Sequence, residues 1–111
     1  MSSGQHQMEL ILKAKEMMEL ANKSFREHSL DYAENEKNYR IALAKKIIIL
    51  KAEGYAATLI LDVSKGDEEV AKLKMKRDIS SGLMASAQSA IYSYRLEYKT
   101  LNEQFKTDMF A

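Results

Sequence analysis

The sequence contains no cysteine, no proline and no tryptophan, and it has only two histidines and four glycines among 111 residues. Without cysteine the chain can form neither a disulfide nor a thiolate nucleophile, although this absence leaves the redox compartment open. Without proline, nothing in the sequence interrupts a long helix. These absences favour an all-helical protein and remove several kinds of catalytic and metal-binding site.

Long apolar runs are also missing. The longest, at residues 47–50, has only four residues and cannot span a bilayer. Residues 1–7 lack the basic and apolar regions of a signal peptide. We therefore expect a disordered lead-in at residues 1–7 and a cytoplasmic protein.

The charge of the chain is almost balanced. Charged residues make up 30% of the sequence, yet the formal net charge is only +1. A strongly basic balance is the usual sign of a nucleic-acid binder. Nucleic-acid binding by this chain must therefore depend on local clusters of basic residues.

The first long segment, residues 8–53, is rich in strong helix formers. Steps of three and four residues alternate large side chains with small or polar ones, which is typical of a coiled-coil-like seam between helices. Residues 29–38 are the least apolar part, where a kink or a break is possible, and Gly54 is placed to end the helix. The seam positions are Ile11, Ala14, Met18, Ala21, Phe25, His28, Tyr32, Asn35, Tyr39 and Ala42.

A short connecting helix is expected at residues 56–65, with Gly66 after it, and Asp67 is a good N-cap for a second long helix at residues 67–109. Within that helix, Gly82 predicts a close helix contact or a kink. The two long helices should lie antiparallel as a single helical-hairpin domain that gains stability by forming oligomers. The second seam comprises Val70, Leu73, Arg77, Ser80, Met84, Ala87, Ile91, Tyr94, Tyr98, Leu101 and Phe105.

Residues able to carry catalysis are scarce. His28 falls on the first seam without a second histidine or a cysteine to complete a metal site, so a packing role is favoured. No glycine-rich phosphate loop occurs. We expect no enzyme activity, no cofactor and no metal. Arg77 is a charge on the second seam and needs a partner. Asp62 or a neighbouring subunit is favoured over Asp78, whose side chain starts in another direction.

Two surfaces could bind other molecules. Folding of the hairpin brings basic residues on either side of the turn together, either as a solvated face or, in an assembly that repeats them, as phosphate contacts. Apolar residues at the open end and along the seams predict an oligomer or partner interface. That predicted interface comprises Ile11, Met18, Phe25, Tyr94, Tyr98 and Phe105.

A family resemblance rests on residues 39–46, 50–54, 57–62, 65–71, 76–78 and 90–91. These segments are similar to small helical proteins of tailed phages and prophages of Gram-positive bacteria, often encoded near replication and recombination genes. The resemblance covers residues 39–105, and the layout also resembles phage recombination mediators. It implies self-association, single-stranded DNA binding, and a recombinase or single-strand-binding protein as partner. It implies DNA contact at Lys45, Lys46, Lys72, Lys76 and Arg77.

The leading hypothesis is therefore an oligomeric accessory protein of phage recombination or replication that acts in the host cytoplasm. The alternative is a helical protein-binding module that inhibits a host or defence protein and binds no nucleic acid. A structural phage component, such as a scaffold or a tail chaperone, is a third possibility. The sequence does not decide among these three classes.

Overall fold

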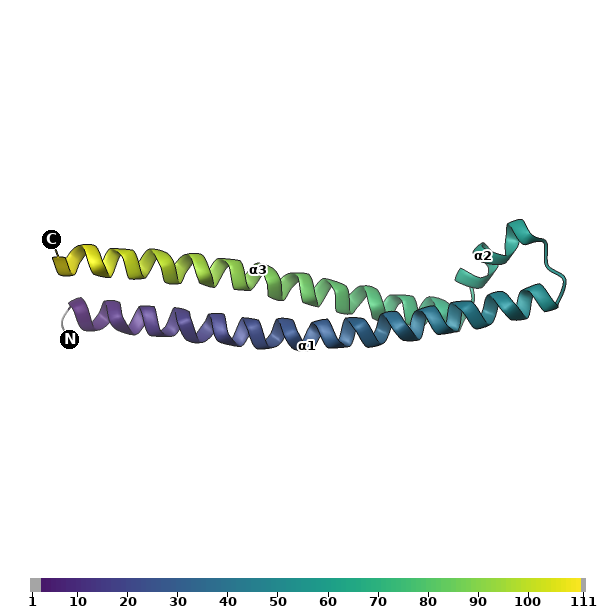
Figure 1. The fold of residues 1–111 in the computed structure, drawn as a ribbon, viewed down its shortest axis with the longest axis horizontal. Helices are drawn as coiled ribbons and strands as arrows, with labels where there is room; N and C mark the ends of the chain where they lie inside the picture. The colour runs from purple at the N-terminus through teal and green to yellow at the C-terminus, as the bar shows by residue number, and fades with distance from the viewer. Residues whose placement is uncertain (1–2, 111) are drawn as a thin grey trace. The chain divides into compact units, whose positions relative to one another are not determined.

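The computed structural model describes residues 3–110, which form three helices: α1 (Ser3–Ala52), α2 (Ala57–Lys65) and α3 (Glu68–Phe110) (Figure 1). The all-α prediction is confirmed, with two long helices and a short connecting one. Contacts between residues divide the chain into two units. Unit 1 contains the described residues up to 27 and from 84 onward, and unit 2 contains residues 28–83.

Helix α1 begins earlier than the sequence analysis expects. Residues 3–7 are helical, so the prediction of a disordered lead-in is wrong for them, while Met1 and Ser2 lie outside the described residues. The Gln7 amide donates a hydrogen bond to Asp108 at 2.5 Å, a contact with α3 that sequence periodicity does not reveal. The helix also continues without a break through residues 29–38.

In unit 1, α1 and α3 run antiparallel. Gln7 near the start of α1 contacts Asp108 near the end of α3, whereas Phe25 lines one pocket together with Ile91, which lies earlier in α3. Ala14 and Ala21 alternate with larger apolar residues on the first predicted seam, and Ala87 lies between Met84 and Ile91 on the second, which permits close approach of the helices. The buried residues of this unit are Ile11, Ala14, Ala21, Ala87 and Ile91.

In unit 2, α1 and α3 are again antiparallel, because Asn35 pairs with Ser80 whereas Lys46 pairs with Asp67. The short helix α2 buries Ile60 and Ser64. The apolar core of this unit is small and lies on one side of each helix. It consists of Tyr39, Leu50, Ile60 and Val70.

The two turns of unit 2 follow the predicted stop and start signals. Gly54 has a φ of +84°. Two backbone hydrogen bonds close the end of α1: Gly54 N–H donates to Lys51 O at 3.2 Å, and Tyr55 N–H donates to Leu50 O at 3.1 Å. This is the Schellman pattern. Asp67 caps α3 by accepting a hydrogen bond from Val70 N–H at 3.2 Å. These signals fix where the chain reverses.

The sequence predicts a close helix contact or a kink at Gly82. A Cβ placed there would meet no other atom within 4 Å, and α3 continues through this position. The predicted close helix contact at Gly82 is therefore absent within residues 3–110, and the predicted kink stays a prediction. The residue lies on an exposed part of α3.

Candidate interaction surfaces

A polar layer crosses the seam of unit 2 where α1 meets α3. Asn35 Nδ2 donates to Ser80 Oγ at 3.2 Å, and the Ser80 hydroxyl donates to the Arg77 carbonyl at 2.8 Å. Ser80 is only 4% exposed, so its hydroxyl needs this partner. We use the name polar layer for Asn35, Glu36, Arg77 and Ser80.

Arg77 occupies the predicted seam position, and its partners correct the expectation of Asp62 or a neighbouring subunit. Its Nη1 lies 3.2 Å from Glu36 Oε2, and its Nη2 lies 3.0 Å from Asp78 Oδ1. The guanidinium carbon stands 4.6 Å from the centre of the Tyr39 ring. The Cβ atoms of residues 77 and 78 diverge, but the arginine is long enough to turn back to its neighbour. The Asp78 hydrogen bond is the main cause that raises the pKa of Arg77.

Glu36 is shared by two arginines. Arg40 Nε donates to its Oε1 at 2.6 Å, while Arg77 approaches Oε2 across the seam. Oε2 is buried and has no well-aligned hydrogen bond, so its contact with Arg77 at 3.2 Å is an ion pair rather than a directed bond. The Arg40 hydrogen bond is the largest influence and, with the charge of Arg77, lowers the pKa of Glu36. Glu36 therefore links α1 to α3 as an anion.

A groove of about 430 Å³ opens beside this layer, where α2 approaches α1. Its floor is apolar and its border is mostly basic. We call it the α1–α2 groove. It is lined by Glu36, Tyr39, Arg40, Leu43, Ala44, Ile47, Leu61, Lys65 and Arg77.

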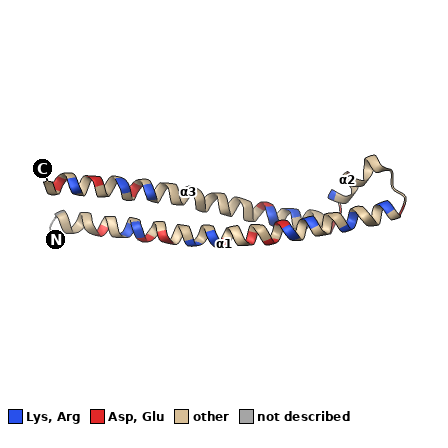
Figure 2. Ribbon diagram, in the orientation of Figure 1, with Lys and Arg blue, Asp and Glu red and all other residues tan. Residues whose placement is uncertain are grey.

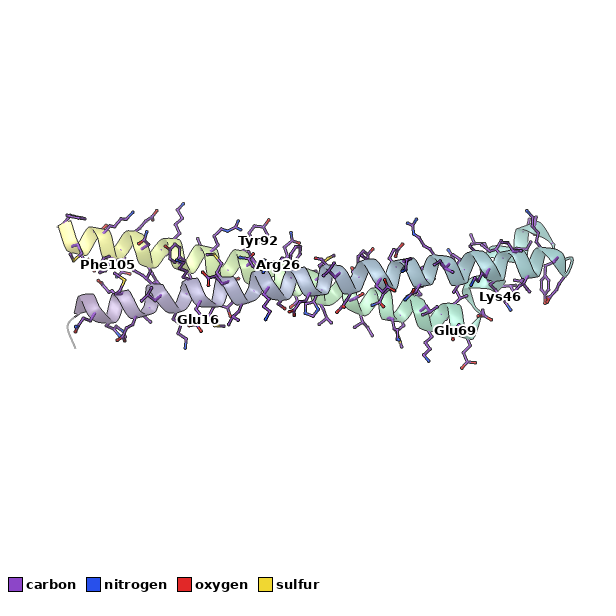
Figure 3. All side chains as sticks on the ribbon, turned by 60° about the horizontal axis from the view of Figure 1, so that its bottom comes forward. Glu16, Arg26, Lys46, Glu69, Tyr92 and Phe105 are labelled. Atoms are coloured by element: carbon purple, nitrogen blue, oxygen red, sulfur yellow. The ribbon has the colours of Figure 1, made fainter. Side chains whose placement is uncertain are left out.

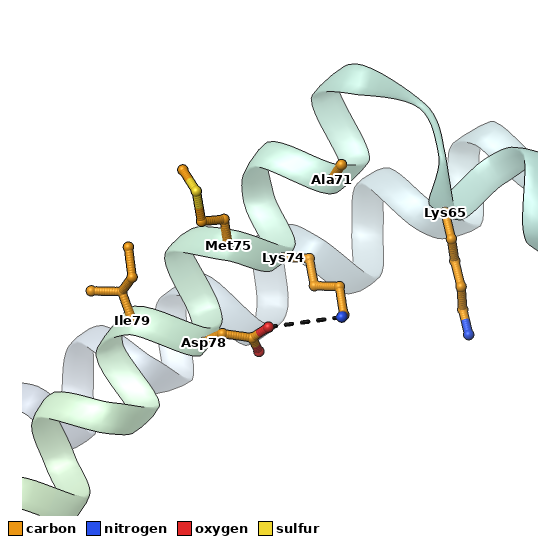
Figure 4. Close-up of a pocket in the computed structure, with 6 residues that line it drawn as sticks. All are labelled: Lys65, Ala71, Lys74, Met75, Asp78 and Ile79. Carbon is orange, nitrogen blue, oxygen red and sulfur yellow. Dashed lines mark ion pairs between the residues drawn. The ribbon is translucent and has the colours of Figure 1, made fainter.

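A second hollow lies along α3 near the end of α2 (Figure 4). Met75 and Ile79 are 58% and 55% exposed, and Ala71 is exposed beside them. An ion pair between Lys74 and Asp78, at 3.8 Å, borders these apolar side chains. We call Ala71, Met75 and Ile79 the outer face of α3.

All five residues predicted to contact DNA belong to unit 2. Lys45, Lys72 and Lys76 are exposed and form no ion pair with any residue of 3–110, and Lys72 and Lys76 lie one turn apart on α3. Lys46 instead pairs with Asp67 at 3.4 Å, and Arg77 belongs to the polar layer.

Basic and acidic residues are interspersed along the helices (Figure 2). Unit 2 contains ten basic and nine acidic residues. A near-neutral unit attracts phosphate weakly over a distance. Among the predicted positions, DNA contact would then depend on Lys45, Lys72 and Lys76, for which the described residues provide no acidic partner.

The predicted interface residues line the seam of unit 1. Ile11 is buried, and the other five are half-buried between α1 and α3; Phe105 is labelled in Figure 3. The large exposed apolar side chains of this unit occupy positions outside the seam, which a single apolar stripe does not predict. They are Met8, Leu10, Leu12, Leu20, Tyr92, Leu96, Met109 and Phe110.

Neither a metal centre nor a membrane helix is found in the described part of the chain. Residues 3–110 contain no group of three or more metal-binding side chains and no helix with the length and apolarity needed to cross a membrane. His28 is half-buried, and its Nδ1 has no hydrogen-bond partner. Its packing role stays a prediction.

Comparison of the chain with protein-family models, with curated proteins and with solved structures finds no match. The resemblance to phage proteins therefore stays a prediction.

Proposed function

We propose that this chain is a helical interaction module that carries out no catalysis and acts by binding other proteins, including copies of itself. The supporting observation is the number of large apolar side chains that unit 2 leaves in solvent. Eleven of its residues are of this kind: Leu30, Ile41, Ile48, Ile49, Tyr55, Leu59, Leu61, Val63, Met75, Ile79 and Leu83.

The proposal follows from the energy available in these side chains. Removing the exposed half of one aliphatic side chain from water contributes about 1 kcal/mol. Several of them buried together can outweigh the entropy lost on association. Scattered apolar residues need no explanation, but Met75 and Ile79 are neighbours one turn apart on the same helix face. The outer face of α3 is therefore the first surface to test for self-association.

The test is sedimentation velocity over a range of protein concentrations. The wild-type chain is expected to gain mass as its concentration rises. Met75→Lys combined with Ile79→Lys should keep the chain monomeric while its circular dichroism spectrum stays helical. The matched control is Leu30→Lys, which makes the same kind of change at an apolar side chain of α1 that is 73% exposed and lies outside the outer face. The proposal would be contradicted if the wild-type chain stays monomeric at every concentration and the double variant loses no binding partner.

The second candidate is the phage recombination mediator suggested by the family resemblance. The observation that favours it is the trio Lys45, Lys72 and Lys76, which are exposed without ion pairs in one unit. In this role an oligomer would repeat the trio, bind single-stranded DNA and bring in a recombinase or a single-strand-binding protein.

Fluorescence anisotropy of a labelled single-stranded oligonucleotide separates the two candidates. For a mediator, the affinity should fall steeply with salt, with a logarithmic slope of about −0.7 for each phosphate contacted. Lys72→Glu with Lys76→Glu should then abolish binding and leave helicity intact. An absence of binding at low salt and high protein concentration would leave the protein-binding proposal alone.

A further inference from the structure

The α1–α2 groove has the dimensions of a site for a helix. Along α1 it runs from Glu36 to Ile47, a rise of about 16 Å or three helical turns. The intervening positions Arg40 and Leu43 continue one side of the helix at steps of four and three. Helix α2 has only nine residues and contributes Leu61 and Lys65 to the lining. Helix α3 contributes Arg77, and the other lining residues belong to α1.

The floor of the groove suits an apolar helix face. Leu43, Ala44, Ile47 and Leu61 supply only aliphatic atoms, and Leu61 is 47% exposed. Ala44 is small and exposed, so a second backbone can approach α1 closely there. Helices that bind in such grooves insert side chains at positions i, i+3 or i+4, and i+7. The apolar part of the lining on α1 runs from Tyr39 to Ile47, about two helical turns, which is the span from i to i+7.

The charges at the border of the groove select the partner. Arg40, Lys65 and Arg77 are set against one acid, Glu36. Arg40 uses its Nε for Glu36, and its side chain is 77% exposed, so its other donors face solvent. Lys65 is exposed and has no ion-pair partner in the described part of the chain. The free donors of Arg40 and Lys65 favour carboxylates on the incoming helix.

We infer that the α1–α2 groove docks an amphipathic helix of a partner protein whose apolar face is flanked by aspartate or glutamate. The outer face of α3 in a second copy fits less well, because it is flanked by Lys72 and Lys76, while only Lys74 is paired, with Asp78. Those lysines would oppose Arg40 and Lys65. The inference rests on the proposed protein-binding function and specifies the chemistry of the partner.

The experiment titrates the full chain into two fluorescein-labelled helical peptides of about four turns, both with leucines at i, i+4 and i+7. One peptide has glutamates beside the leucines, and its twin has lysines. The glutamate peptide should bind about tenfold more tightly at low salt. Arg40→Glu with Lys65→Glu should reverse that preference, which a purely apolar contact would not do.

Ala44→Glu tests the position of the site, because it places a charge on the apolar floor. It should weaken binding of the glutamate peptide by at least about tenfold. Ile48→Glu is the matched control on α1: Ile48 is 67% exposed and outside the groove, so binding should be unchanged. Circular dichroism melting of each variant establishes that it is folded.

The inference would be overturned if both peptides bind with equal affinity, or if Ala44→Glu leaves peptide binding unchanged. It would also be overturned if the wild-type chain binds neither peptide and Ala44→Glu abolishes self-association. That last result would assign the groove to a second copy. If neither peptide binds but self-association through Met75 and Ile79 persists, only the assignment of the α1–α2 groove is rejected. Loss of both kinds of binding would reject the proposed function as well.

Discussion

Glu36 Oε2 lies 3.2 Å from Arg77 Nη1, so that one carboxylate on α1 meets one guanidinium on α3 across the seam of unit 2. Both side chains are about one-fifth exposed. Asn35 and Ser80 form a hydrogen bond beside them. Polar groups in an otherwise apolar helix interface define its register, because any sliding of the helices leaves them unpaired. We attribute the alignment of α1 with α3 in unit 2 to this layer.

The first prediction concerns acid. The pKa of Glu36 is lowered below its ordinary value of 4.5, chiefly by the Arg40 hydrogen bond. A carboxylate with a lowered folded-state pKa contributes stability that is complete above the unfolded-state value and is lost as the pH falls through the folded-state value. The melting temperature should therefore decrease below about pH 4.5. Melts followed by circular dichroism from neutral to acidic pH measure this effect.

Glu36→Gln should make the wild-type decrease in acid shallower. It should not abolish the decrease, because the pKa of Asp67 is also lowered, first by the Val70 backbone N–H and then by Lys46. The double variant Glu36→Gln with Asp67→Asn should be flatter than either single variant. An unchanged acid profile in the double variant would mean that neither pair stabilises the fold.

The second prediction separates the two roles of Asp67. Its Oδ2 accepts the Val70 N–H, and its Oδ1 lies 3.4 Å from Lys46 Nζ. Asp67→Ala removes both contacts and should lower the melting temperature by several degrees. Asp67→Ser retains a capping oxygen and should recover most of the loss. If serine and alanine give the same melting temperature, the ion pair with Lys46 is the contact that matters.

The third prediction is that replacing two glycines by alanine changes the stability of the chain in opposite directions. Gly82 has ordinary helical geometry with open space at its Cβ position, so Gly82→Ala should stabilise the chain by about 1 kcal/mol in urea unfolding. Gly54 has a φ of +84°, so Gly54→Ala should destabilise it by about 1 kcal/mol. A destabilising Gly82→Ala would indicate that a second molecule packs closely at that position.

Periodicity was sufficient to place the residues that pack between the long helices. Positions such as Ile11, Tyr39 and Ile91 are buried as expected, because apolar spacing encodes which face of a helix leaves water. Gly54 and Asp67 were identifiable because each meets a local backbone requirement. These features depend on residues close together in the sequence.

The features that the sequence did not reveal depend on side-chain reach and on contacts distant in the chain. Arg77 turns back to Asp78, which helical direction alone argues against. Contact between Gln7 and Asp108 joins residues 101 positions apart. The α1–α2 groove forms only when α2 packs near α1, so no sequence motif predicts it. The DNA-contact residues stay a prediction, with Lys46 and Arg77 now paired to acids.

The last prediction tests how tightly unit 1 is packed. Ala14 is only 2% exposed on the seam, so a leucine there adds three carbons where the facing helix leaves little room. Ala14→Leu should destabilise the chain by about 1–3 kcal/mol, although leucine is a good helix former. Ala85→Leu is the matched control: the same substitution at an exposed position of unit 1 should change stability by less than about 0.5 kcal/mol. Urea unfolding distinguishes the two variants. Equal stability would mean that the seam can open by the width of a side chain, and close packing of α1 with α3 would then not be what holds unit 1 together.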